Sequence, residues 1–96
     1  MAELLADQEI EQRLGALEGW YREDDAIVRD IESKDFADAI ALVNAVAAVA
    51  EAADHHPDIL VHGWNKLRLS VTNHSAGGLT AADFALAAEI DGLPGV

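Results

Sequence analysis

The stretch FADAIALVNAVAAVAEAADHHP, residues 36–57, decides how the rest of the chain is interpreted. Its apolar residues recur at spacings of three, four and seven, which is typical of an α-helix. Ser33 or Asp35 can cap the start of this helix. Pro57 pushes the residue before it out of the helical region, so we expect a helix over 36–53. Its predicted core face consists of Phe36, Ala39, Ile40, Val43, Val46, Ala47 and Ala50.

The other faces of this helix are apolar as well. They carry Ala41, Leu42, Ala45, Ala48, Val49 and Ala52. A helix that is apolar nearly all round is buried on more than one side. In a chain of this size the second side most simply faces another subunit, so the sequence predicts a homo-oligomer, a dimer or a tetramer, through helix 36–53. The alternative is an alanine-rich helix whose small side chains are tolerated in water.

Downstream of the helix, two strands and a further helix are expected. Residues 59–62 form an apolar run, and residues 66–73 alternate between apolar and polar side chains, which predicts a half-buried strand. Thr80 is a suitable helix cap, with Asp83 three positions on in the manner of a capping box. A last helix is therefore expected over 81–90.

Upstream, the spacing of leucines and Ile10 predicts an amphipathic helix over 3–17. Residues 20–22 and 26–32 are predicted to be strands joined by the acidic turn 23–25. The order helix, strand, strand, helix, strand, strand, helix indicates an α+β two-layer fold. We expect a four-stranded antiparallel sheet with helices packed on one face, in a single domain over residues 1–96.

Composition and charge restrict the functions to be considered. Eighteen acidic residues face six basic ones, a net charge of −12, so a nucleic-acid partner is not expected. The acidic surface fits solubility, as in the high-salt cytoplasm of a halophile, or else a basic protein partner. The chain has no cysteine, and its longest nearly apolar run, 39–50, is shorter than a membrane span of about 20 residues. With no signal-peptide pattern at the start, we expect a cytoplasmic protein without a membrane partner.

All four histidines lie within a short part of the chain: His55, His56, His62 and His74. If the two later strands pair, His74 returns to the vicinity of the adjacent pair, where Glu51 and Asp54 could orient an imidazole. Three interpretations are open: a metal site, structural histidines in turns, and acid–base catalysis. Adjacent histidines rarely bind one ion, because their side chains diverge. No serine-nucleophile motif and no phosphate-binding glycine loop is present, so neither acyl transfer nor a nucleotide cofactor is indicated.

One segment also carries a family resemblance. Residues 51–59, EAADHHPDI, resemble the E-x-x-x-H-H-P signature of the pterin-4a-carbinolamine dehydratases. The resemblance continues through Trp64-Asn65-Lys66, through His74 and through the segment GGLT at 77–80. Upstream, Gly19-Trp20, Ala26-Ile27 and Asp35-Phe36 also correspond to family positions. The resemblance therefore covers nearly the whole chain.

This resemblance implies a lyase. Members of the family remove water from 4a-hydroxytetrahydropterin to give quinonoid dihydropterin, which recycles the cofactor of aromatic amino-acid hydroxylases, without a metal or a cofactor of their own. By position, His55, His56 and His74 are implied as the catalytic histidines. The residues implied for pterin binding are Glu51, Thr72, Asn73 and Ser75, with Trp20 either lining the site or serving as a core aromatic residue. The alternative is a non-catalytic binding or regulatory partner protein with the same fold.

The sequence departs from the family pattern at two places. Asn73 stands where the family usually has threonine before the histidine. One extra residue lies between Pro57 and Asn65, near Gly63, where we expect a bulge or a longer turn. An insertion within a strand would turn later side chains to the other face unless a bulge absorbs it, and His74 would then point differently from the family pattern. His62 has no family counterpart and is expected to be exposed.

Overall fold

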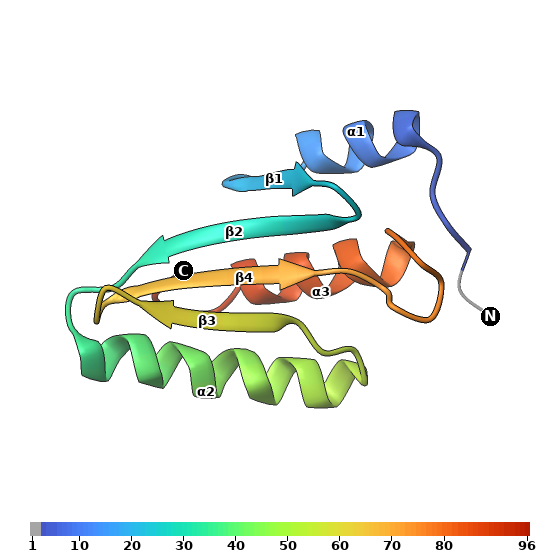
Figure 1. Ribbon diagram of the computed structural model, residues 1–96. Coiled ribbons are helices and arrows are strands. Elements are labelled where there is room, and N and C mark those ends of the chain that lie inside the picture. Colours follow the sequence, from blue (N-terminus) through green and yellow to red (C-terminus); the bar gives the residue numbers. More distant parts are fainter. Residues whose placement is uncertain (1–2) are drawn as a thin grey trace.

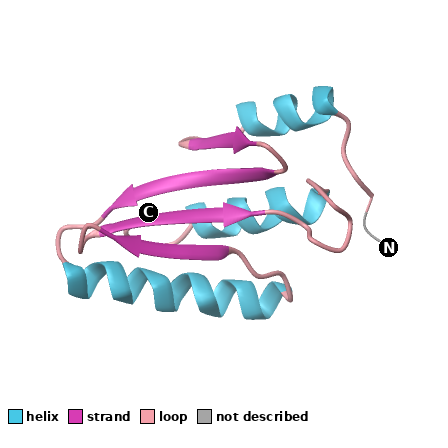
Figure 2. Cartoon of the chain, viewed as in Figure 1, coloured by secondary structure: helices cyan, strands magenta, loops and turns pink. Residues whose placement is uncertain are grey.

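The computed structural model describes residues 3–96, and the first two residues of the predicted domain lie outside the described part (Figure 1). The elements are α1 (Asp7–Gly15), β1 (Trp20–Glu23), β2 (Ala26–Glu32), α2 (Phe36–Ala53), β3 (Asp58–His62), β4 (Lys66–Val71) and α3 (Ala81–Asp91). Their order is the predicted one, and the strands form one antiparallel sheet (Figure 2). The predicted α+β class is confirmed.

The strands lie in the order β1-β2-β4-β3, so β2 and β4 are the inner strands and β1 and β3 are the edge strands. Along β4, Leu67, Leu69 and Val71 are fully buried, whereas Lys66 and Arg68 are exposed. This alternation means that one face of the sheet carries the core and the other faces water. On the core side α2 and α3 pack against each other, and α1 packs beside β1 at the opposite edge.

Helix α2 has the predicted bounds, but its buried stripe differs from the predicted one. The buried residues are Ala39, Leu42, Val46 and Ala50. Phe36, expected in the core, is 54% exposed, and Ala47 is exposed as well, while Leu42 was expected on another face. The periodicity was ambiguous here because almost every position of the helix is apolar, so spacing alone does not single out one stripe.

Helix α2 is apolar over its whole length, beyond the run 39–50 noted in the sequence. Over all 18 residues the mean hydropathy is 1.6, and 22% of these residues are buried. By length and composition alone the helix could cross a membrane, a test that core helices of water-soluble proteins also pass. In this fold α2 packs one stripe on the sheet and leaves several apolar side chains uncovered.

Gly63 lies in the turn between β3 and β4, and the paired part of these strands contains no bulge. The two strands pair without interruption from Asp58 opposite Ser70 to His62 opposite Lys66. Gly63 and Trp64 both have positive φ values, 54° and 59°, in the turn that joins them. Of the two alternatives expected near Gly63, the bulge is wrong, and a turn over residues 63–65 joins the strands. His62 is exposed, as expected.

Candidate active site

The end of α2 delivers the first histidine to the inside of the molecule. Asp54 adopts a left-handed conformation with φ 50°, and the backbone N–H of His55 donates to the Ala50 carbonyl at 3.1 Å. This turn reverses the chain, as left-handed helix ends commonly do. It places the His55 side chain, 15% exposed, between α2 and the start of α3.

At the start of α3, His55 meets a buried carboxylate. His55 Nε2 lies 2.6 Å from Asp83 Oδ1, and the Asp83 side chain is fully buried. The other oxygen, Oδ2, accepts from the backbone N–H of Thr80 at 2.7 Å and from its hydroxyl at 3.1 Å. Asp83 thus caps α3 with one oxygen and holds an imidazole with the other. When the carboxylate is ionised, Nε2 carries the proton and donates it to Asp83, which leaves Nδ1 as an acceptor.

An open hollow of about 820 Å³ adjoins this pair. It is lined by Glu3, Leu4, Asp54, His55, Asn73, Ser75 and Ala76. Its volume is within the roughly 300–1,000 Å³ range of small-molecule sites. The segment that carries Glu3 and Leu4 is held in place by the backbone N–H of Leu5, which donates to the Leu79 carbonyl at 2.9 Å.

The loop after β4 forms another wall of the hollow. Asn73 and Gly78 form an isolated antiparallel bridge that closes the loop, and Asn73 Oδ1 accepts from the backbone N–H of Ala76 at 3.0 Å. Through this hydrogen bond the Asn73 side chain stabilises the turn of the loop, at the position where the family usually has threonine. Thr72 donates its hydroxyl to the Asp25 carbonyl, which ties the loop to the β1–β2 turn.

His74 is exposed on this loop and lines a neighbouring hollow of about 330 Å³. Asn73 lines both hollows, so His55 and His74 lie in two hollows that share this residue. Ser75 faces the His55 side and Thr72 faces the His74 side. The structure therefore brings together most of the implied site residues around the 73–78 loop.

His56 is differently placed from its neighbour. His56 Nε2 lies 3.5 Å from Glu51 Oε1, and the two side chains are 58% and 77% exposed. Neither residue lines the hollows described above. Glu51 and His56 thus form a loose surface pair at the end of α2, beside the site.

Trp20 lies outside the site. Its side chain is buried in the core and donates from Nε1 to Asp91 Oδ1 at 2.8 Å. Asp91 ends α3, whereas Asp83 lies at its start, about 12 Å away along the helix. Of the two roles considered for Trp20, this structure shows the core aromatic residue.

Asp83 is the site residue that sequence reasoning missed, because its spacing from Thr80 indicated only a capping role. The capping pattern fixes where one carboxylate oxygen points. The partner of the other oxygen depends on how α2 and α3 pack, which local spacing does not reveal. Within residues 3–96, no group of three or more His, Asp or Glu side chains is arranged to hold a metal ion.

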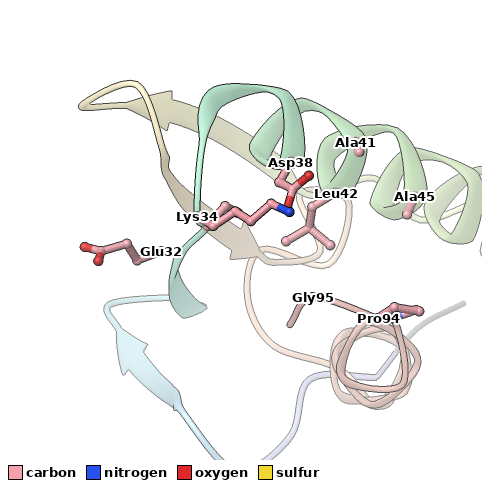
Figure 3. A pocket seen from close by; sticks show the side chains of 9 residues that line it. Glu32, Lys34, Asp38, Ala41, Leu42, Ala45, Pro94 and Gly95 are labelled. Carbon is pink, nitrogen blue, oxygen red and sulfur yellow. The ribbon is translucent and has the colours of Figure 1, made fainter.

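A further hollow, of about 500 Å³, lies away from the histidines (Figure 3). Leu42 and Ala45 of α2 line it on one side, and Pro94 and Gly95 of the C-terminal tail on the other. Lys34 Nζ lies 3.6 Å from Asp38 Oδ2 at its rim. The titratable residues of its lining, Glu32, Lys34 and Asp38, are all exposed, so the histidine region with its buried carboxylate is the stronger candidate for catalysis.

The fold and the site define a class: a small α+β domain with a histidine–carboxylate pair beside an open hollow. The family model described as pterin 4 alpha carbinolamine dehydratase matches residues 3–93. The chain belongs to this family.

Individual relatives agree with this assignment. A protein of Roseiflexus castenholzii, provisionally named a pterin-4-alpha-carbinolamine dehydratase, is 54% identical over 91 residues, which cover 95% of this chain and 97% of that protein. A relative from Chloroflexus aurantiacus with the same provisional name is 48% identical over 91 residues, with the same coverage of both chains.

Two solved structures are also similar. A transcriptional coactivator/pterin dehydratase from Brucella melitensis has a TM-score of 0.87 at 32% identity, covering 93% of this chain and 96% of that one. A pterin dehydratase-like protein identified as a RuBisCO assembly factor in the alpha-carboxysome has a TM-score of 0.59 at 22% identity, covering 75% and 82%. The second likeness concerns the fold alone.

Proposed function

We propose that the protein is a 4a-hydroxytetrahydropterin dehydratase that releases water and forms quinonoid dihydropterin. The observation that supports this most directly is the pair of His55 and the buried Asp83 beside an open hollow. Family membership supplies the substrate class, and the histidine–carboxylate pair supplies a group suited to moving a proton.

The reaction requires one proton to leave and one to arrive. The ring nitrogen N5 loses its proton, its electron pair forms the N5=C4a bond, and the 4a-hydroxyl leaves as water after gaining a proton. In this proposal Nδ1 of His55 accepts the N5 proton, while Asp83 stabilises the imidazolium that forms. His74, on the adjoining wall, donates to the departing hydroxyl.

The remaining implied residues have supporting roles in this proposal. Ser75 and Asn73 line the hollow and offer polar atoms to the edge of the pterin. His56 and Glu51 line neither hollow but lie next to His55 at the end of α2, where they assist positioning or a second proton transfer.

The test is the rate of dehydration of chemically generated 4a-hydroxytetrahydropterin, followed by ultraviolet absorbance. We expect the wild type to accelerate the reaction, and His55→Ala and His74→Ala each to lose about 100-fold or more of that acceleration. His55→Gln is the matched control for folding, because its amide can still donate to Asp83 but cannot transfer a proton. A folded wild type that does not accelerate dehydration would contradict the proposal.

A second candidate, a partner protein that binds through α2, is favoured by one observation. Phe36 is 54% exposed, and only 22% of the residues of this apolar helix are buried within the chain. We propose that α2 is covered by another protein surface, most simply α2 of a second copy, in a dimer or a tetramer. This is compatible with catalysis, because the histidine region lies at the far end of the helix from Phe36.

The oligomer is tested by light scattering after size-exclusion chromatography. A charge placed on the exposed part of α2, by Ala41→Glu with Ala48→Glu, is expected to lower the molecular mass toward that of one chain. Ala85→Glu, at an exposed position of α3, adds a charge elsewhere and should leave the mass unchanged. A wild type whose mass in solution is that of one chain, 10.2 kDa, would contradict the proposed interface.

A further inference from the structure

The walls of the histidine hollow carry negative charge. The lining includes the carboxylates of Glu3 and Asp54, both exposed, and among the described lining residues there is no lysine or arginine. The adjoining hollow around His74 repeats this composition. Its lining contains Glu23, Asp24 and Asp25, and its described residues again include no lysine or arginine.

The few basic side chains of the chain are engaged elsewhere. Four of them form ion pairs at 3.6 Å or less that lie outside both linings, namely Arg13–Glu9, Arg29–Asp91, Lys34–Asp38 and Arg68–Asp30. Lys66 opens β4, at the end of the strand opposite to the 73–78 loop. Arg22 comes nearest to the hollows, because its Nε donates to the Asp24 carbonyl at 3.0 Å, but its Nη1 is paired with Asp7 at 2.9 Å.

This distribution matters for the part of the substrate that does not react. The hollows around a pterin ring held against His55 are walled by carboxylates, and no lysine or arginine of the described chain lines them to pair with an anionic substituent. Low-dielectric walls that carry one sign of charge repel ligands of the same sign and attract those of the opposite sign. The net charge of −12 adds to this effect at longer range.

We propose that the site selects pterin carbinolamines by the charge of their substituent, accepting neutral or cationic substituents and rejecting phosphorylated or carboxylated ones. The inference rests on the proposed function, because it assumes that the pterin ring occupies the His55 hollow.

The test compares two substrates that differ by one anionic phosphate group: the carbinolamines of 6-hydroxymethyl-tetrahydropterin and of its phosphate ester. At pH 8 and low ionic strength, kcat/KM is expected to be roughly 10- to 100-fold higher for the hydroxymethyl compound. At 1 M salt the difference should shrink toward unity, because the Debye length falls to about 3 Å. Equal values at low salt, or a preference for the phosphate ester, would overturn the proposal.

Paired variants assign the effect to the hollow. Glu3→Gln with Asp54→Asn should reduce the discrimination at low salt several-fold, and asparagine at position 54 tolerates the left-handed backbone there. Glu11→Gln with Glu89→Gln removes the same charge from exposed positions outside the hollows and should leave the discrimination intact. Equal effects of the two pairs would show that only net charge matters and would contradict the assignment to the hollow.

A binding measurement separates this inference from the proposed activity. Calorimetry with the stable compounds 6-hydroxymethyl-7,8-dihydropterin and its phosphate ester reports selection without turnover. Tighter binding of the neutral compound without catalysis would refute the dehydratase and retain the charge selection. Catalysis without any difference between the substrates would refute the charge selection alone, and the absence of both catalysis and binding would refute both.

Discussion

Two neighbouring histidines at the end of α2 form pairs with carboxylates in contrasting surroundings. His55 lies 2.6 Å from Asp83, with side chains 15% and 0% exposed, whereas His56 lies 3.5 Å from Glu51, with side chains 58% and 77% exposed. A close pair held away from water keeps its geometry and its electrostatic strength, while an exposed pair is screened and contributes little. Both pairs consist of an imidazole and a carboxylate, so a difference in their behaviour reports the effect of burial and distance rather than of chemical identity.

The largest expected difference between the pairs is in catalysis. Asp83→Asn should lower kcat about 100-fold, because an amide neither fixes the Nε2–H form of His55 nor stabilises its imidazolium. Glu51→Gln, the same chemical change in the exposed pair, should lower kcat by no more than about 3-fold. The measurement is the pH dependence of kcat for both variants. A positioning role for Asp83 predicts a changed pH profile, and equal losses in the two variants would contradict the comparison.

A second difference is expected in folding stability. Asp83→Ala leaves Thr80 and His55 without their buried partner and removes the cap of α3, which together should cost about 3 kcal/mol of unfolding free energy. Glu51→Ala should change the unfolding free energy by less than about 0.5 kcal/mol. Urea unfolding followed by circular dichroism measures both. A loss below about 1 kcal/mol for Asp83→Ala would show that the pair contributes little to folding.

The sequence predicted much of the fold for physical reasons that are local. The alternation of Leu67, Leu69 and Val71 with polar residues specified β4 and its buried face, because side chains of a strand alternate between faces. Helix α2 has the expected bounds, with Asp35, one of the two predicted caps, before its start and Pro57 shortly after its end. The buried stripe of α2 was not predictable in the same way, since nearly every position of that helix is apolar.

The site was predictable only in part. The histidines could be named from the sequence, but their environments could not, because the packing of α3 beside α2 decides that His55 is covered while the adjacent His56 stays exposed. Asp83 lies 28 residues from His55 and reaches it only because α3 packs beside α2. Tertiary packing supplied this contact, and no local pattern encodes it.

A smaller effect is expected when salt is varied. A double-mutant cycle of His56→Ala and Glu51→Ala should give a coupling free energy below about 0.5 kcal/mol at pH 6 and low salt, and none at 1 M salt. The corresponding cycle for His55 and Asp83 should retain most of its coupling at 1 M salt, because the pair is buried. A coupling that disappears with salt in both cycles would show that burial does not protect the inner pair.

The smallest effect is expected at Asp30, an exposed carboxylate on the other face of the sheet. Its hydrogen bonds have good geometry but no burial, so it tests geometry without burial. Asp30 accepts from Tyr21 and from Arg68, both at 2.8 Å. The Arg68 guanidinium, followed by the Tyr21 hydroxyl, holds the pKa of Asp30 below its usual 3.8, and the hydrogen bond to Asp30 raises the pKa of Tyr21 above 10.0. Good geometry is present here, so any weakness of this cluster must come from its exposure to water.

The pH dependence of this cluster follows from the lowered pKa of Asp30 and the raised pKa of Tyr21. A lowered carboxylate pKa stabilises the folded state above pH 3.8, and this contribution is lost as the pH falls through the lower folded pKa. A raised phenol pKa stabilises the folded state below pH 10.0, and this contribution is lost as the pH rises through the higher folded pKa. Asp30→Asn should therefore lower Tm by about 1–3 °C at pH 7, and its difference from the wild type should vanish as the pH falls well below 3.8. A Tm difference that persists in acid would mean that the substituted amide disturbs the packing of the sheet. A loss of Tm as large as that caused by Asp83→Ala would mean that good geometry alone, without burial, makes such a pair strong.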